Sequence, residues 1–154
     1  MATDIPAPAE IDIDARQGTP LHHVMQFFED AAATQPTDFT GWTFSMQIRE
    51  GVADSNAHVV KALSCEDSDP NIKFIAEASG EPDLNGTPDP TNGYLYIYLS
   101  SEETALLRTL KAPKARDYPV SLTFYYDIEG TPPAGEPQAL AYGTLTVACE
   151  VTRG

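Results

Sequence analysis

The 154-residue sequence contains little cysteine and no long apolar run. Two cysteines, Cys65 and Cys149, cannot supply a disulfide framework, and without spaced histidines they do not form a zinc site. No segment approaches the roughly 18 apolar residues of a membrane span, and residues 1–6 lack the basic flank and apolar core of a secretory signal. We therefore expect a protein made and folded in a cytoplasm, with both cysteines reduced and Cys149 buried on the last strand.

Positive charge is also scarce. Nine lysines and arginines face 23 aspartates and glutamates, which gives a formal net charge of -14. Such a surface repels phosphate backbones and anionic lipid, so we expect neither a nucleic-acid partner nor a membrane partner. The exception is a short basic stretch at residues 111–117, which the sequence predicts as a turn.

Catalytic and metal-binding patterns are missing as well. The three histidines are His22, His23 and His58, and no nucleophile motif such as G-x-S-x-G accompanies them. His22 and His23 are adjacent on an expected strand, so they point to opposite faces and cannot share a metal. Residues 66–69 and 83–86 hold only fragments of a calcium loop. We therefore expect no enzyme activity, no metal and no cofactor.

Several segments instead alternate apolar and polar residues, as half-buried strands do. Residues 94–99 read Tyr-Leu-Tyr-Ile-Tyr-Leu, and residues 120–128 and 145–151 also place apolar side chains at every second position. The inward set expected for residues 41–49 is Trp42, Phe44, Met46 and Ile48. Each such strand must bury one face, so the sequence predicts an all-β, antiparallel β-sandwich of seven to eight strands around one core.

Local signals place a helix and the longest loops. Ser100 is followed three residues later by Glu103, the spacing of a capping box, which predicts a short helix over residues 101–107. The chain has 13 prolines and 10 glycines, and these predict a breaker-rich loop at residues 79–92 and an exposed hairpin tip at residues 129–137.

The expected domain plan is an extended N-terminal arm, residues 1–10, followed by a single sandwich domain, residues 11–154. The arm has few apolar residues, and its prolines lower the entropy lost when it becomes ordered. We expect the arm to contact a neighbouring protein, with the hairpin tip as a second contact. The candidate contact residues in these two segments are Pro6, Pro8, Pro132 and Pro133.

A tyrosine stripe is the remaining candidate surface. Tyr94, Tyr96 and Tyr98 share one face of their strand. If exposed, the stripe would suit contact with protein or carbohydrate, which makes a carbohydrate-binding module one alternative function. Aromatic packing within the sheet, or cover by a loop, is the other interpretation.

Three segments, in order along the chain, resemble the sequence motifs of one known family. Residues 38–49 (Asp-Phe-Thr-Gly-Trp-Thr-Phe-Ser-Met-Gln-Ile-Arg) are similar to that family's D-L-T-G-x-t-x-x-x-Q-v-R strand. Residues 95–107 resemble its l-x-i-x-L-S-x-x-E-T-a-x-L strand and helical turn, and residues 143–152 resemble its G-x-l-x-V-x-x-e-V-T final strand. The chain thus resembles a family of small bacteriophage structural proteins, which are similar to the N-terminal immunoglobulin-like domain of the siphophage baseplate upper protein.

The resemblance implies an immunoglobulin-like sandwich that serves as a non-enzymatic virion structural protein. Its place would be the tail, baseplate or fibre, where it would act as an assembly or adaptor module in symmetric copies. Its partners would be other phage structural proteins, and its location the virion. A head decoration (cement) protein on the capsid surface is the alternative within the same class.

Overall fold

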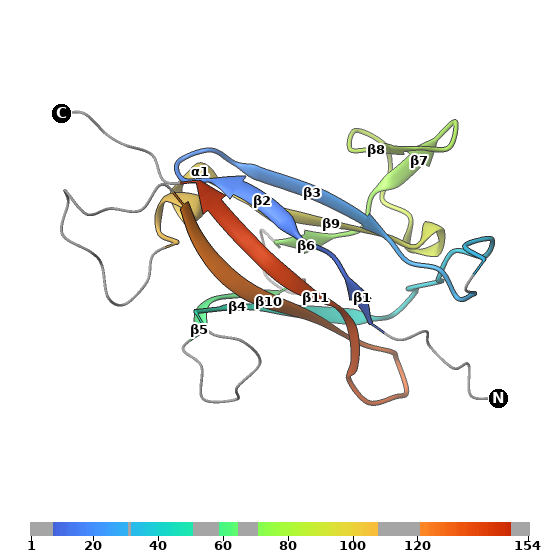
Figure 1. Ribbon diagram of the computed structural model, residues 1–154. Helices are drawn as coiled ribbons and strands as arrows, with labels where there is room; N and C mark the ends of the chain where they lie inside the picture. Colours follow the sequence, from blue (N-terminus) through green and yellow to red (C-terminus); the bar gives the residue numbers. More distant parts are fainter. Residues whose placement is uncertain (1–7, 31, 51–58, 65–70, 108–120, 149–154) are drawn as a thin grey trace, which may run out of the picture.

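The computed structural model describes residues 8–30, 32–50, 59–64, 71–107 and 121–148. It shows two β-sheets packed face to face around a shared hydrophobic core (Figure 1). The elements in chain order are β1 (Ala9–Glu10), β2 (Ile13–Arg16), β3 (Leu21–Gln26), β4 (Thr43–Arg49), β5 (Val59–Ser64), β6 (Ile72–Lys73), β7 (Ala76–Ala78), β8 (Glu81–Asp83), the 3-10 helix η1 (Pro90–Asn92), β9 (Tyr94–Leu99), α1 (Ser101–Ala105), β10 (Ser121–Thr131) and β11 (Gln138–Ala148). The predicted all-β sandwich with one short α-helix is confirmed.

The larger sheet has the order β1-β11-β10-β4-β5, and β2 also pairs with β11. The long strands β10 and β11 form an antiparallel hairpin, in which Phe124 lies opposite Leu145 and Tyr126 opposite Gly143. β1 and β2 run parallel to β11, a departure from the purely antiparallel pairing expected from the sequence. The first segment of the chain therefore lies along the outer edge of the last strand.

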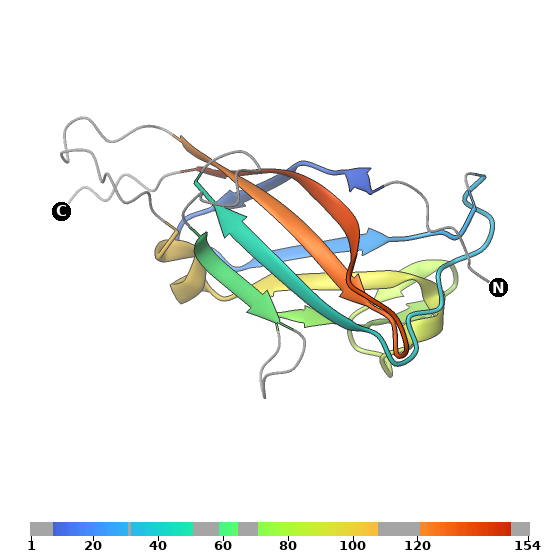
Figure 2. The ribbon, with the colours of Figure 1, turned by 90° about the horizontal axis from the view of Figure 1, so that it is seen from below.

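The smaller sheet has the order β3-β9-β6, and its strands cross those of the larger sheet at an angle (Figure 2). β11, β10, β4 and β5 occupy the places of strands G, F, C and C′ of an immunoglobulin domain, and β3, β9 and β6 those of B, E and D. A two-stranded hairpin, β7-β8, projects beside the smaller sheet. The sandwich is therefore immunoglobulin-like.

The core lies between the inward faces of the two sheets. Phe44, Met46 and Ile48 of β4 are buried, as their alternation predicts. Trp42 precedes β4 and is only half-buried, with its ring packed against Phe39 and Phe44. The expectation that Trp42 is a full core residue is therefore corrected, because its ring covers the margin of the core.

The described residues form eleven strands, more than the seven to eight expected, because several of the strands are only two or three residues long. The expected loop at residues 79–92 contains β8 and η1, and a two-residue turn at Ser79 and Gly80, both with positive φ, connects β7 to β8. The expected arm is shorter than residues 1–10, because Ala9 and Glu10 pair with β11. The hairpin tip is also shorter than expected, since β10 continues to Thr131 and β11 begins at Gln138.

Several residues singled out in the sequence lie outside the described residues. These are Pro6, His58, Cys65, the basic stretch 111–117 and Cys149. In the part of the chain that is described, no helix is long and apolar enough to cross a membrane.

Candidate functional site

The tyrosine stripe of β9 is packed within the fold. Tyr94 is 7% exposed and Tyr96 8% exposed, and together with Ile75 they form a second hydrophobic cluster on the outer side of the smaller sheet. Burial raises the pKa of Tyr94, and Glu77 and Glu81 of the β7-β8 hairpin raise it further, because they lie close to the ring. The interpretation of Tyr94 and Tyr96 as an exposed contact surface is therefore wrong; loop cover and sheet packing take its place.

The exposed end of this stripe is occupied by stacked side chains. Tyr98 is half-buried, its ring centroid lies 5.2 Å from that of His22, and Lys73 Nζ lies 5.6 Å from the ring centre. His22 also forms a hydrogen bond with the hydroxyl of Tyr96. His23 lies on the opposite, inward face of β3, where burial lowers its pKa. The two histidines therefore diverge as predicted.

No arrangement in the described residues is suited to metal binding. No group of three or more histidine, cysteine, aspartate or glutamate side chains there could hold a metal ion. Asp83, part of the incomplete calcium pattern, accepts a hydrogen bond from the backbone N–H of Asn85 and so closes a turn. Within the described part of the chain, every buried side-chain nitrogen and oxygen has a hydrogen-bond partner.

The outer face of the larger sheet offers a different surface. Strand register places Gln47, Asp127, Tyr142 and Glu10 in one row across β4, β10, β11 and β1. The adjacent row holds Arg49, Tyr125 and Thr144. This face is polar and aromatic, in contrast to the apolar inward face.

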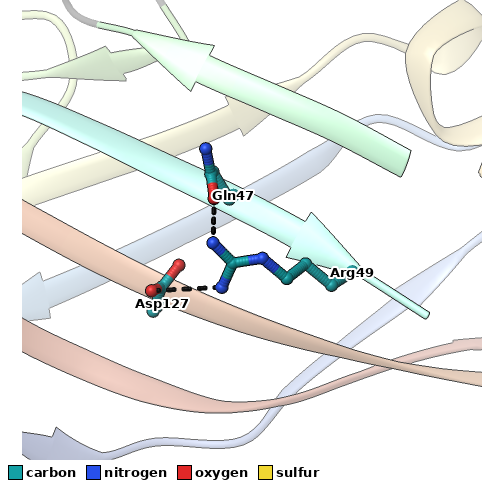
Figure 3. Close-up of polar contacts among 3 residues, drawn as sticks. All are labelled: Gln47, Arg49 and Asp127. Atoms are coloured by element: carbon teal, nitrogen blue, oxygen red, sulfur yellow. Dashed lines mark hydrogen bonds and ion pairs between the residues drawn. The ribbon is translucent and has the colours of Figure 1, made fainter. Parts of the chain in front are cut away.

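Arg49 is held across two strands of this face (Figure 3). Its Nη1 donates to Asp127 Oδ2 at 3.3 Å, and its Nη2 donates to Gln47 Oε1. The Arg49 side chain is 22% exposed and that of Asp127 37%, so the ion pair is partly shielded from water. The guanidinium is thereby fixed at the sheet surface, with its charge largely matched by Asp127.

Beside this ion pair lies a groove of about 420 Å³. Its walls include Glu10, Asp12, Arg49, Tyr125, Asp127 and Tyr142. Tyr142 is 45% exposed, and its hydroxyl donates to Glu10 Oε2 at 3.3 Å. Aromatic rings with carboxylates beside them favour binding of another molecule.

The edge of the groove is formed where the chain passes from β1 to β2. A Cβ on Gly143 would lie 2.1 Å from the carbonyl oxygen of Ile11, so only glycine permits this approach. The Tyr126 hydroxyl donates to the same carbonyl, and Asp12 accepts from the N–H of Thr144 at 3.1 Å and its hydroxyl at 3.0 Å. Burial, and to a lesser degree Asp12, raise the pKa of Tyr126.

Three of the candidate prolines, Pro8, Pro132 and Pro133, lie among the described residues. Pro8 and Pro133 are exposed, and Pro132 is half-buried at the turn where Gly135 N–H donates to its carbonyl at 3.3 Å. A Cβ on Gly41 would lie 2.7 Å from Pro133 Cγ, so the tip packs on the turn before β4. The structure does not bring these prolines into the groove.

Sequence reasoning missed the groove because it followed apolar periodicity. The signal was the opposite face of the same strands: Arg49, Tyr125, Asp127 and Tyr142 occupy the alternate positions between core residues. Their convergence depends on the register between β4, β10 and β11, which periodicity within each strand leaves undefined.

Comparison with known proteins finds a likeness among solved structures and no matching family. No family model and no curated protein matches the chain. Among solved structures, one from a structure-based photo-crosslinking analysis of multimeric cell-adhesive interactions of VGSC beta subunits is similar, at 10% identity and a TM-score of 0.37. The match covers 98% of this chain and 100% of the other, and at this identity and TM-score it carries no argument about fold or function.

Proposed function

We propose that this protein is a non-enzymatic bacteriophage virion structural protein, an adaptor associated with the tail, baseplate or fibre. The proposal starts from the three segments that resemble small phage structural proteins. The observation that carries it furthest is the position of Gln47 and Arg49, the polar pair of the first segment, on the outer sheet face beside the groove.

Other residues of these segments have roles in folding. Thr40 donates its N–H and hydroxyl to Asp38, and Gly41, with φ +79°, turns the chain into β4. Ser100 and Glu103 form a capping box at α1. Any sandwich of this kind could use such turns and caps, so they support the fold. Gln47 and Arg49 are not part of the core, and they support a surface role.

In this proposal the protein acts through contacts with other phage structural proteins, in symmetric copies within the virion. The outer sheet face is the main contact surface. Residues 1–7 and the exposed tip around Pro133 are additional contacts. The abundance of acidic side chains keeps contacts between free copies weak until an ordered array offers many sites at once.

The direct test is to locate the protein in purified particles. Particles from cells that carry the gene would be banded in a density gradient, separated into heads and tails, and analysed by quantitative mass spectrometry. The proposal predicts a fixed stoichiometry to the tail proteins. Recovery with heads would support the cement alternative, and absence from particles would refute both.

Carbohydrate binding is a second candidate function. The buried tyrosines of β9 cannot contact a sugar, but the groove on the larger sheet could hold one. Tyr142 and Tyr125 offer aromatic rings, and Asp127 and Glu10 offer hydrogen-bond acceptors beside them. A glycan array with the wild-type protein tests this function. Binding that a Tyr142→Ala variant loses and a Tyr98→Ala variant keeps would establish it, and absence of binding would remove it.

A further inference from the structure

The groove on the outer sheet face is richer in negative than in positive charge. Glu10, Asp12 and Asp127 line it, together with Arg49, whose guanidinium is paired with Asp127. No basic side chain in the described part of the chain forms an ion pair with Glu10 or Asp12, and both carboxylates are exposed. The groove therefore presents net negative charge to an incoming molecule.

A lysine or arginine side chain matches this surface. Carboxylates attract its cationic head group, and so does the face of an aromatic ring. Tyr142 presents an exposed ring next to Glu10, and Tyr125 lines the groove beside it. The aliphatic stem of a basic side chain can pack on these rings while its head group reaches the carboxylates.

The chain itself contains a segment with this chemistry. Residues 108–116 read Arg-Thr-Leu-Lys-Ala-Pro-Lys-Ala-Arg, and they hold four of the nine basic residues of the protein with no acidic residue among them. The segment lies outside the described residues, and its sequence alone defines its charge. The rest of the chain is strongly acidic. Charge complementarity thus pairs the groove with residues 108–116.

The groove lies toward one end of the larger sheet, and β10, the next described strand after the basic segment, begins at the other end. Ser121, which follows the basic segment, pairs with Ala148, whereas Glu10 pairs with Tyr142. Six residues of β11, about 20 Å, separate these positions. Figure 1 shows β10 starting beside α1, and β1 toward the other end of β11. A contact between opposite ends of two copies is heterologous, and repeated contacts of this type build rings or filaments.

We infer that the groove of one copy binds the basic segment 108–116 of the next copy. A head group from Lys111, Lys114 or Arg116 enters between Glu10, Asp12 and the ring of Tyr142. The inference rests on the proposed function for its setting, because a head-to-tail contact gives the symmetric copies that a virion protein forms.

Zero-length cross-linking of the full chain tests this contact. A carbodiimide joins a lysine amine directly to a carboxylate with which it is paired. With an equal mixture of ¹⁵N-labelled and unlabelled protein, the expected products link Lys111 or Lys114 to Glu10 or Asp12 and include mixed-isotope pairs. Links in same-isotope pairs only would show that the segment binds its own groove, and absence of these links would also overturn the inference.

Charge reversal provides the second arm. In sedimentation velocity, Glu10→Lys and Lys114→Glu should each weaken self-association about tenfold, and mixing the two variants should restore a heterologous pair. Glu29→Lys and Arg16→Glu are matched controls at exposed sites away from the groove walls, and they should associate like the wild type. Equal loss in the controls would assign the effect to net charge and contradict the inference.

Two further readouts separate this contact from other causes. Circular dichroism and thermal unfolding confirm that each variant is folded, and Glu10→Gln should give an intermediate loss of association. These experiments use purified protein alone. If the links and the charge-reversal effects are absent but the protein is present in purified tails, the inferred contact is refuted and the proposed function is not. If the protein self-associates as expected but is absent from particles, only the proposed function is refuted.

Discussion

At the scale of single residues, the docking of the first strands depends on a few contacts around Ile11. Gly143 leaves room for the Ile11 carbonyl, Tyr126 donates to it, and the Ile11 N–H donates to Tyr142 at 2.9 Å. The Asp12 carboxylate accepts hydrogen bonds from the N–H and the hydroxyl of Thr144. These contacts shape one wall of the groove, so the fold and the candidate site share the same residues.

Gly143→Ala should destabilise the protein by about 1–3 kcal/mol, because the new methyl group would displace the backbone at Ile11. Chemical denaturation followed by Trp42 fluorescence measures the change. Thr146→Ala, on the outward side of the same strand, is the control and should stay within about 0.5 kcal/mol of the wild type. Equal stability of the two variants would contradict the close approach.

His23 should make stability depend on pH near neutrality. Burial lowers its pKa from the ordinary value of 6.5, so below that pH the unfolded chain binds a proton that the folded chain binds only at lower pH. Stability is therefore complete above pH 6.5 and falls as the pH drops toward the folded-state pKa. A His23→Gln variant should show a flatter profile between pH 7.5 and 5 than a His22→Gln variant; identical profiles would exclude His23 as the cause.

At the scale of elements, the sequence predicts those features whose signals are local. Alternation identifies β4, β9, β10 and β11 because each buries one face, and Ser100 with Glu103 identifies α1. The two-residue strands β1 and β6 have too few positions for a period to be visible. Their pairing depends on distant partners, as β1 shows by running parallel to β11.

For a related reason, the sequence offers both an exposed and a covered tyrosine stripe and does not decide between them. Alternation correctly assigns Tyr94, Tyr96 and Tyr98 to one face of β9. It does not show that Ile75 and the β7-β8 hairpin lie over that face, because those contacts join separate segments of the chain. Likewise, the groove exists only once β1 and β11 are paired.

The capping box of α1 predicts a clear effect. Ser100 Oγ accepts from the N–H of Glu103, and Glu103 accepts from the N–H of Ser100, each at 3.1 Å. Ser100→Ala should therefore cost about 1 kcal/mol in the free energy of unfolding, measured by urea denaturation. Ser101→Ala, one position into the helix and exposed, should have almost no effect. A similar loss in both variants would argue against capping.

At the scale of the whole molecule, the outer faces of the two sheets differ. The outer side of the smaller sheet is covered by Ile75 and stacked aromatic side chains, whereas the larger sheet presents a groove with an exposed tyrosine. Both sheets share one hydrophobic core, so we expect a single cooperative unfolding transition. The proposed assembly uses the outer face of the larger sheet, which lies on the side away from this core.

Hydroxyl-radical footprinting of Tyr142 in the free protein and in purified particles tests assembly through this face most directly. Tyr142 is 45% exposed in the single chain, and Leu84, at 53%, serves as an internal reference outside the groove walls. We predict that Tyr142 is labelled readily in the free protein and strongly protected in particles, while Leu84 changes much less. Equal labelling of Tyr142 in both states would contradict assembly through the outer face of the larger sheet.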